Sequence, residues 1–405
     1  LAAEFGTPAF IFCEQTFRAR AQEFRLACPS SKIYYAAKAF LSRSICKLAQ
    51  EEGLCLDVAS SGELHCALQA GFPAERIILH GNNKQQADVE TAVEAGIDMI
   101  AIDNLEDPAC INAAAVKAGR VQKVVVRVTP GVEAHTHEYI QTGQEDSKFG
   151  LSIQGGLAEA AIRLAGDQER LELIGVHAHI GSNVFSYDPF GKTIEILFQL
   201  AAELKAKLGI ELQELNLGGG YGIAYVTGDD PVRLSDLSDL VDEAVVRESS
   251  RHGLGVPAIS FEPGRYLIGP AMVTLYRVGA IKSIPGVRTY VSVDGGMADN
   301  IRPALYQAKY SALLANKVGE EPEEVVTLAG MHCESGDILV KDAALPASIS
   351  RGDIVVVPAT GAYGYSMASN YNRQPRPPVI AVKDGKANVM IRRETHDDLM
   401  GLEQG

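Results

Sequence analysis

Short apolar runs recur along the first two thirds of the chain, and segments with helical periodicity separate them. In segments 61–71 and 86–96, apolar residues recur at i, i+3 and i+4 and a glycine follows, which is typical of an amphipathic helix and its end. Regular alternation of strands and helices predicts parallel strands. The eight predicted strands are KIYYAAKA (32–39), GLCLDVAS (53–60), RIILHGNN (76–83), DMIAID (98–103), KVVVRVTP (123–130), LIGVHAHIGS (173–182), ELNLGGG (214–220) and AISFEPG (258–264).

The number of strand–helix units favours a closed barrel. Eight units over roughly 240 residues match the ~250 residues typical of a (β/α)8 barrel. A doubly wound sheet would also alternate strands and helices, but eight units favour closure. We therefore predict an α/β fold with a (β/α)8 TIM barrel over residues 28–270.

The rhythm changes after about residue 270, where runs with strand character follow one another with little helix between them. We predict a second, mostly antiparallel β domain, a β-sandwich or β-barrel. The opening run TPAFIFCE (7–14) also predicts a strand, and we assign it to the second domain, which is then discontinuous: residues 1–27 plus 271–405. Its later strands are expected in 271–284, 288–296, 323–333 and 353–363.

Composition narrows the class of protein. The 405 residues are 46% hydrophobic and 22% charged, which is ordinary for a globular protein. The net charge of −14 argues against a general basic surface for nucleic acid. No apolar run reaches the length of a membrane span, so we expect no membrane association. The seven cysteines form no CxxC pair, which indicates a reducing compartment, the cytoplasm, and no thiolate metal site.

Polar residues gather where the predicted barrel strands end, and this is where barrel enzymes place their active sites. Each of them taken alone is more often a loop residue or a satisfied core residue, but their recurrence around the barrel favours one shared site. They are Lys38, Asp57, His80, Asn82, Arg127, His179, Ser182, Gly218, Gly219, Gly220, Glu262 and Arg265.

The residue types at these positions favour pyridoxal phosphate chemistry. Lys38 interrupts an apolar run, so either it leaves the strand at its end or the protein needs an amine there. The glycine run 218–220 lets backbone N–H groups approach an anion, and Arg265 offers a bidentate phosphate partner. An acid such as Glu262 would hold a pyridine nitrogen protonated, while Lys38 would bind the aldehyde as a Schiff base. His179 could stack on the ring.

Twelve motifs, in order along almost the whole chain, resemble one family. They are similar to the alanine-racemase-like, fold-type III decarboxylases that use pyridoxal phosphate, and to the diaminopimelate decarboxylase family among them. Some of these motifs lie in the predicted barrel strands, and the others lie in the segments between the strands or in the second domain. GVEAHTHEY resembles the actinobacterial branch. The motifs are YYAAKA, DVASSGEL, HGNNK, GVEAHTHEY, KFGLS, HAHIGS, LNLGGGYGI, EPGR, VDGGMADNIRPALY, CESGD, GAYGYSMASNYN and RRET.

The resemblance implies the decarboxylation of meso-2,6-diaminopimelate to L-lysine and CO2, the last step of lysine biosynthesis. It implies a homodimer in which CESGD reaches into the neighbouring subunit's site, with a small amino-acid substrate and no resident metal. Carried over by position, the catalytic residues are Lys38, His179 and Cys333. The cofactor-binding residues are Lys38, Asp57, His179, Ser182, Gly218, Gly219, Gly220, Glu262, Gly264, Arg265 and Tyr363, and the substrate-binding residues are Arg265, Arg302, Tyr306, Glu334 and Tyr363.

Three alternatives stay open. A decarboxylase of the same fold could act on ornithine or arginine, but such a substrate needs an acid and no arginine at its far end, whereas Arg302 can fork a carboxylate. A metal-dependent hydrolase barrel could use His177 and His179 with the pair at 135 and 137, since alternate strand residues share a face; Lys38 would then have no role. A non-catalytic carrier of pyridoxal phosphate would leave Arg302 and Cys333 unexplained.

Overall fold

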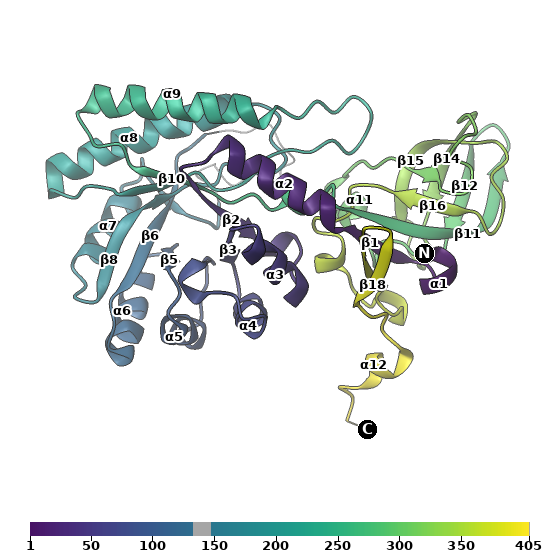
Figure 1. Ribbon diagram of the computed structural model, residues 1–405, viewed down its shortest axis with the longest axis horizontal. Helices are drawn as coiled ribbons and strands as arrows, with labels where there is room; N and C mark the ends of the chain where they lie inside the picture. The colour runs from purple at the N-terminus through teal and green to yellow at the C-terminus, as the bar shows by residue number, and fades with distance from the viewer. Residues whose placement is uncertain (133–146, 405) are drawn as a thin grey trace. The chain divides into compact units, whose positions relative to one another are not determined.

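The computed structural model describes residues 1–132 and 147–404 and divides into two compact units (Figure 1). The barrel unit contains Arg20–Gly222 and Pro231–Arg265, and the β unit contains Leu1–Ala19, Ile223–Asp230 and Tyr266–Gly405. Most of the GVEAHTHEY motif, including the histidines at 135 and 137, lies outside the described residues. Within these described ranges no helix is long and apolar enough to cross a bilayer.

The barrel unit is a closed ring of parallel strands, which confirms the predicted (β/α)8 barrel. Each strand pairs in parallel with the next, and the ring closes because β2 pairs with β10 and β5 with β6. A short strand, β7 (Leu151–Ser152), adds to the end of β6. The ring strands are β2 (Lys32–Ala36), β3 (Cys55–Val58), β4 (Ile77–Leu79), β5 (Met99–Ile102), β6 (Gln122–Thr129), β8 (Leu171–His177), β9 (Glu214–Asn216) and β10 (Ala258–Phe261).

Helices connect the ring strands, and local signals fix where several of them begin and end. The hydroxyls of Ser42 and Ser60 accept N–H groups at the starts of α3 and α4. Gly96 and Gly119 end α5 and α6 in the left-handed conformation that glycine adopts without strain. The connecting helices are α3 (Arg43–Glu51), α4 (Ser61–Gln69), α5 (Gln86–Ala95), α6 (Asp107–Ala118), α7 (Leu157–Gly166), α8 (Asp188–Leu208) and α9 (Leu234–His252).

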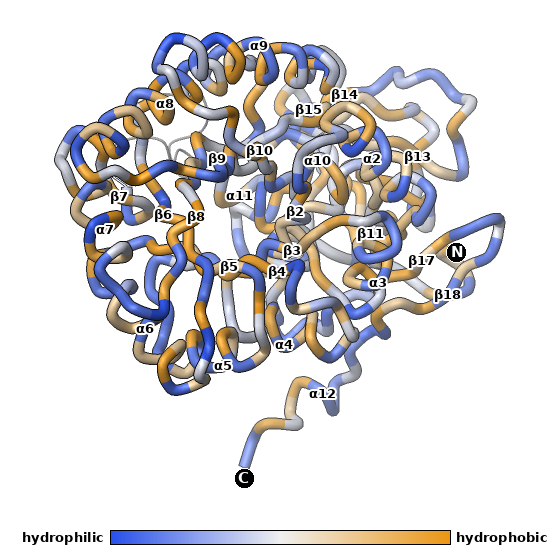
Figure 2. Tube along the Cα trace, turned by 60° about the vertical axis from the view of Figure 1, so that its left-hand side comes forward, coloured by the Kyte–Doolittle hydropathy of each residue, from blue (hydrophilic) through white to orange (hydrophobic). Residues whose placement is uncertain are grey.

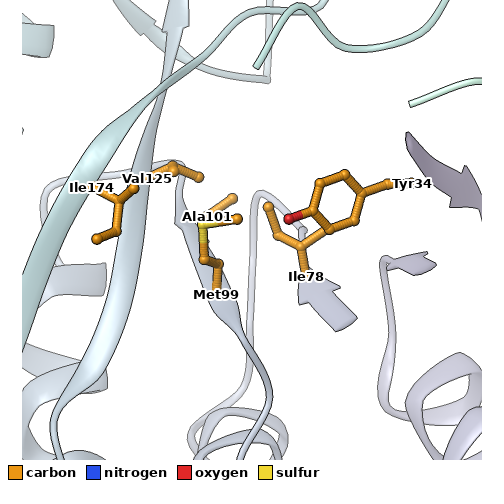
Figure 3. Packing of buried hydrophobic residues seen from close by; sticks show 6 residues of the cluster. All are labelled: Tyr34, Ile78, Met99, Ala101, Val125 and Ile174. Atoms are coloured by element: carbon orange, nitrogen blue, oxygen red, sulfur yellow. The ribbon is translucent and has the colours of Figure 1, made fainter. Parts of the chain in front are cut away.

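Inside the barrel, the side chains are apolar along the strands and become polar at the carboxyl ends of the strands, the mouth of the barrel. Figure 3 shows side chains of five strands packed together: Tyr34, Ile78, Met99, Ala101, Val125 and Ile174. Because strand side chains repeat every two residues, the next position on the same face carries a polar group in several strands. Two positions after Ile78, Ala101 and Val125 lie His80, Asp103 and Arg127, respectively. Figure 2 shows the hydrophobic stretches along β4 and β5, whereas α8 and α9 alternate between hydrophobic and hydrophilic residues.

The β unit is built on a mixed sheet with the order β15-β14-β12-β11-β1-β17-β18. The opening strand β1 (Ala9–Cys13) lies between β11 and β17. Most pairings are antiparallel, whereas β1–β17 and β12–β14 are parallel. The other strands are β11 (Met272–Ile284), β12 (Arg288–Val293), β13 (Leu313–Leu314), β14 (Glu324–Ala329), β15 (Ile338–Leu345), β16 (Ile354–Val357), β17 (Val379–Lys383) and β18 (Lys386–Ile391).

One short segment from within the barrel sequence belongs to the β unit. The segment 223–230, which follows the glycine run, groups with the β unit and not with the barrel that surrounds it in sequence. The sequence pattern did not indicate this, because a loop of eight residues carries no periodic signal of its own. The remaining helices are α1 (Ala2–Phe5), α2 (Glu14–Ala27), α10 (Arg265–Ile268), α11 (Arg302–Tyr306) and α12 (His396–Met400).

Candidate active site

Lys38 lies directly after the end of its strand. It lies on the 3-10 turn η1 (Ala37–Ala39) that follows β2, where both alanines are buried and the lysine side chain is exposed. The amine is therefore not an isolated buried cation. Gly264 packs on this turn, since a Cβ at Gly264 would lie 3.0 Å from Ala36 Cβ and 3.1 Å from Ala39 Cβ. The close packing of these small residues fixes the position from which Lys38 projects.

The Glu262 carboxylate follows β10 and is held by three donors from three other strands. Its Oε1 accepts His80 Nε2 at 2.8 Å and Asn216 Nδ2 at 2.8 Å, and its Oε2 accepts His177 Nε2 at 3.1 Å. Glu262 is 6% exposed. A carboxylate has about four lone-pair positions, so these three bonds leave one acceptor position, on Oε2.

The charges around Glu262 set its ionisation and that of its neighbours. Burial opposes ionisation of Glu262, but His80 and His177 together hold its pKa well below the usual range. Burial also opposes charging His80, yet the carboxylates of Glu262 and Asp57 raise its pKa. For His177 burial dominates and lowers the pKa to about 4. At neutral pH the site therefore contains an ionised Glu262 and a neutral His177.

His179 lies beside the glycine run as a neutral ring. The N–H of Gly219 donates to His179 Nδ1 at 3.1 Å, so the ring proton sits on Nε2. Burial, with the nearby charges of Lys38 and Arg127, lowers the pKa of His179 well below its usual value. A neutral imidazole held in this way offers a flat apolar face.

The glycine run is needed for close backbone packing, and part of its donor capacity is already used. A Cβ on Gly219 would lie 2.4 Å from Glu262 O, and a Cβ on Gly220 would lie 2.6 Å from Gly181 O. The N–H of Gly218 donates to Asn216 Oδ1 at 2.9 Å, and that of Gly219 is used by His179. Of the three N–H groups, that of Gly220 has no acceptor among the described hydrogen bonds and remains for an anion.

Two further groups belong to the anion-binding end. Arg265 follows β10, and its Nη2 donates to Ser182 Oγ at 2.7 Å. Gly220 packs on Gly181, the residue before Ser182, so the free N–H, the hydroxyl and the guanidinium come from adjoining segments. A guanidinium, a hydroxyl and a backbone N–H together are a typical donor set for phosphate.

Asp57 and Arg127 complete the charge distribution at the mouth. Burial raises the pKa of Asp57, while His80 and Lys38 oppose this effect. Arg127 Nη1 lies 3.5 Å from Asp103 Oδ2, and its guanidinium lies 4.6 Å from the centre of the Phe149 ring.

The hydrolase alternative names four histidines, and two of them, at positions 135 and 137, lie outside the described residues. Among residues 1–132 and 147–404, the group whose ligand atoms lie within 4.8 Å of one another is His80, His177 and Glu262. His179 is not part of this group, and its Nδ1 accepts the N–H of Gly219. In this group both histidine Nε2 atoms, which a metal would need, hydrogen-bond the carboxylate instead.

In the β unit, Arg302 is a buried cation among tyrosines. It is 5% exposed, and its guanidinium hydrogen-bonds the Tyr310 hydroxyl. The guanidinium also lies 4.9 Å from the centre of the Tyr225 ring and 5.5 Å from that of Tyr310. In the part of the chain that the structure describes, no carboxylate pairs with Arg302. A buried charge without a counter-ion is costly, which makes the position a candidate for binding an anionic ligand.

Tyr306 and Tyr363 lie on the same unit. Tyr306 ends α11, four residues after Arg302, so the two side chains share one side of the helix. Tyr363 interacts electrostatically with Arg302 and has a φ of 61°, a left-handed conformation that is strained for an aromatic residue. Packing holds it there, since a Cβ on Gly361 would lie 1.9 Å from Ile268 O and one on Gly364 2.5 Å from Thr360 O.

Cys333 and Glu334 lie on an exposed loop of the β unit between β14 and β15. Glu334 N donates to His332 O at 2.8 Å, which places Cys333 at the tip of a three-residue turn. The Cys333 N–H donates to Asn372 Oδ1 at 3.0 Å. Both side chains are accessible in the isolated chain.

The barrel residues fit pyridoxal phosphate. An accessible amine stands at a strand end, an ionised carboxylate keeps one acceptor position, and a neutral ring offers a flat face. The anion end combines one free backbone N–H with a guanidinium, at backbone positions that a Cβ would fill. These are the four groups that the cofactor requires.

Several residues of these networks were not predicted from the sequence. Asn216 lies on β9 two residues before the glycine run, so spacing alone could have suggested it. His177 was named only as a metal ligand of the hydrolase alternative and not as a partner of Glu262. Asp103 follows Ala101 on the inner face of β5. Tyr225, by contrast, is far from Arg302 in sequence, and Tyr310, although only eight residues after it, belongs to no motif that indicated the contact.

Comparison with known proteins identifies the family. The description "Pyridoxal-dependent decarboxylase, pyridoxal binding domain" matches residues 14–269, and "Pyridoxal-dependent decarboxylase, C-terminal sheet domain" matches residues 184–361. Diaminopimelate decarboxylase of Bacillus subtilis is 47% identical over 100% of this chain and 92% of the relative. That of Mycobacterium tuberculosis is 46% identical with the same coverage. Because these identities are so close, the actinobacterial resemblance stays a prediction.

Solved structures agree with the sequence relatives. Diaminopimelate decarboxylase from M. jannaschii superposes with a TM-score of 0.93 at 32% identity, covering 100% of this chain and 93% of that one. The Helicobacter pylori enzyme, solved in complex with L-lysine, has a TM-score of 0.90 at 30% identity and covers 99% of this chain and 97% of its own. A lysine/ornithine decarboxylase from Vibrio vulnificus, at 21% identity, shares the fold. The chain therefore belongs to the pyridoxal-dependent decarboxylases and, within them, to the diaminopimelate decarboxylase family.

Proposed function

We propose that this chain decarboxylates meso-2,6-diaminopimelate to L-lysine and CO2 with pyridoxal phosphate, as an enzyme of lysine biosynthesis. Membership of the family supports the reaction, and the complex of the Helicobacter pylori relative with L-lysine supports the product. The single observation from the chain itself that favours this substrate is Arg302, a buried guanidinium without a carboxylate partner among the described residues.

In this proposal the barrel holds the cofactor. Bound pyridoxal phosphate supplies an electron sink for the electron pair left behind when CO2 departs. Lys38 would bind its aldehyde carbon, and Glu262 would accept the pyridine N–H through its remaining acceptor position. His179 would stack on the ring, and Asp57 would be a further cofactor-binding residue. The phosphate would be bound by Ser182, Arg265 and the N–H of Gly220, while Gly218, Gly219 and Gly264 would surround it and Tyr363 would be a further contact.

The β unit selects the substrate. Diaminopimelate carries a second α-amino-carboxylate at its far end, so binding it requires a cation and an anion together. Arg302 forks the far carboxylate, and Glu334 pairs with the far ammonium. Tyr306, Tyr363 and Arg265 complete the substrate contacts. Ornithine and arginine would leave Arg302 unpaired, and a site built for hydrogen bonding rejects such analogues strongly.

After CO2 leaves, Cys333 delivers a proton to the carbon that carried it. Cys333 and Glu334 act in the site of a second copy of the chain, so we propose a homodimer with shared sites. The exposure of both side chains in the single chain is compatible with this. We propose the cytoplasm as its compartment, because the seven cysteines are all free thiols.

The test is to measure CO2 and lysine release from meso-diaminopimelate, with ornithine, arginine and lysine as rival substrates. The proposal expects turnover of meso-diaminopimelate far above that of the other three. Turnover of ornithine or arginine at a comparable kcat/KM would favour the related decarboxylases. If pyridoxal phosphate binds but no substrate releases CO2, the protein is a carrier of the cofactor and the proposal fails.

A further inference from the structure

The loop that carries Cys333 is exposed along its length but anchored at two buried ends. Residues 333–336 are exposed, whereas His332 before them and Asp337 after them are buried, at 9% and 3% exposure. His332 Nδ1 donates to Asp337 Oδ2 at 2.9 Å, so the two anchors bond directly to each other. The four exposed residues therefore form a closed loop whose neck is one buried histidine–aspartate pair.

The Asp337 carboxylate is the fixed point of this neck. It accepts the backbone N–H of His332 at 2.8 Å on Oδ2 and that of Met297 at 2.6 Å on Oδ1. A Cβ on Gly330 would lie 2.1 Å from Asp337 Oδ2, and one on Gly296 would lie 2.5 Å from Oδ1. The carboxylate thus fills space that exists because both neighbours lack side chains, and it cannot shift without moving backbone.

A second segment also holds the loop, because two consecutive residues of this segment each contact one residue of the loop or its neck. Tyr371 stacks on the His332 ring, with centroids 5.8 Å apart and planes at 24°. The next residue, Asn372, accepts the Cys333 N–H through Oδ1 and has a φ of 52°, a left-handed conformation that asparagine tolerates. His332 and Cys333 are therefore each fixed by consecutive residues of the turn η5 (Tyr371–Arg373).

The buried histidine carries a cost that a simple packing residue would avoid. With the proton of Nδ1 given to Asp337, Nε2 carries a lone pair, and this buried atom has no hydrogen-bond partner within the described part of the chain. Phenylalanine would provide the same stack on Tyr371 without an unsatisfied nitrogen. The hydrogen bond of Nδ1–H to Asp337 is therefore the feature that distinguishes histidine at this position.

We propose that the His332–Asp337 pair positions Cys333. The pair fixes where the thiol lies and in which direction it points at the tip of its turn. The inference rests on the proposed function, in which Cys333 delivers the proton after CO2 leaves. His332 acts only through Cys333, and it touches neither cofactor nor substrate. Because a reacting group misplaced by about 1 Å can lose roughly 10²-fold in rate, the pair affects turnover without contributing to binding.

The test compares two substitutions of His332 in the holoenzyme. His332→Phe keeps the ring on Tyr371 and loses the donor, whereas His332→Asn keeps a donor near Nδ1 and loses the ring. We expect kcat of His332→Phe to fall about 10- to 100-fold with KM and the visible cofactor absorption unchanged. His332→Asn should recover most of the lost kcat. The matched control is His396→Phe, at an exposed histidine of α12, which should behave as the wild type.

A second readout needs no turnover. The rate at which iodoacetamide alkylates Cys333 is followed by peptide mass spectrometry across pH, without substrate. His332→Phe should change this rate and its pH dependence, and His332→Asn should restore both. If His332→Phe does not fold, Asn372→Ala replaces it, since it removes the acceptor of the Cys333 N–H at an exposed position. It should lower kcat at unchanged KM.

Wild-type kcat in His332→Phe, or in Asn372→Ala where it stands in, would overturn the inference. So would an inactive His332→Asn, because the ring and not the donor would then matter. If the wild type itself releases no CO2 from meso-diaminopimelate, the proposed function fails. The alkylation comparison still decides separately whether His332 positions the thiol.

Discussion

Replacement of Arg302 by lysine tests whether this residue binds the far carboxylate of the substrate. Arg302→Lys keeps the positive charge but replaces a planar fork by a single ammonium. The change removes one of two charge-assisted hydrogen bonds to the far carboxylate, and such a bond contributes about 1.5–3 kcal/mol. We therefore expect kcat/KM for meso-diaminopimelate to fall at least about tenfold, which corresponds to ~1.4 kcal/mol.

The division of this loss between KM and kcat follows from the place of Arg302 in the reaction. The far end of the substrate does not change during decarboxylation, so Arg302 binds ground state and transition state alike. Most of the loss should then appear as a higher KM. L-lysine keeps the far carboxylate of diaminopimelate, so its inhibition of the enzyme should weaken in parallel. Cadaverine, which lacks any carboxylate, should inhibit wild type and variant equally.

The assay combines steady-state CO2 release with the visible absorption of the bound cofactor, which should not change because other residues bind it. The matched control is Arg288→Lys, an exposed arginine of β12 whose guanidinium lies 5.8 Å from the Tyr290 ring centre. This variant should keep wild-type kinetics. An unchanged kcat/KM in Arg302→Lys would refute the assignment of the far carboxylate to Arg302.

Three further predictions address the rest of the site. Borohydride reduction of the holoenzyme should attach the pyridoxyl group to Lys38, and Lys38→Ala should abolish the attachment; a label on another lysine would contradict it. Mixed Lys38→Ala and Cys333→Ala enzymes should regain activity once subunit exchange is verified, and continued inactivity would argue against shared sites. Histidine NMR of the cofactor-free protein should show His80 titrating above about 6.5 and His177 at about 4. The contribution of His80 to the free energy of unfolding is then lost as pH rises through its raised pKa. The contribution of His177 is lost as pH falls from about 6.5 towards about 4.

The sequence predicted the barrel well because the signals are local. Each of the eight runs is short, apolar and bounded by turn residues, and each corresponds to a ring strand. Lys38 was singled out because a lysine in an apolar run is unusual, and the structure shows that it leaves the strand on η1. The polar site positions were found because they lie at the ends of the predicted barrel strands, where barrel enzymes place their active sites.

The contacts that tune these residues could not be predicted, because they join distant parts of the chain. Tyr225 lies 77 positions before Arg302, and its loop groups with the β unit although the surrounding sequence forms the barrel. The glycine run predicted a phosphate cradle of three N–H groups. In the structure Gly218 and Gly219 give theirs to Asn216 and His179, partners that a motif does not reveal.

Two buried charged residues, Glu262 in the barrel unit and Arg302 in the β unit, have different roles in the proposed function. Glu262 binds the cofactor, and Arg302 selects the substrate. Glu262 is 6% exposed and already has three donors, so it is ionised whether or not a ligand is present. Arg302 is 5% exposed and has tyrosines but no carboxylate among the described residues, so its counter-ion must come from elsewhere. The barrel is thus complete for chemistry that pyridoxal phosphate offers to any amino acid. In the proposed function, a substrate that carries its own far carboxylate supplies the counter-ion of Arg302, and the buried cation then selects among amino acids that the barrel alone would treat alike.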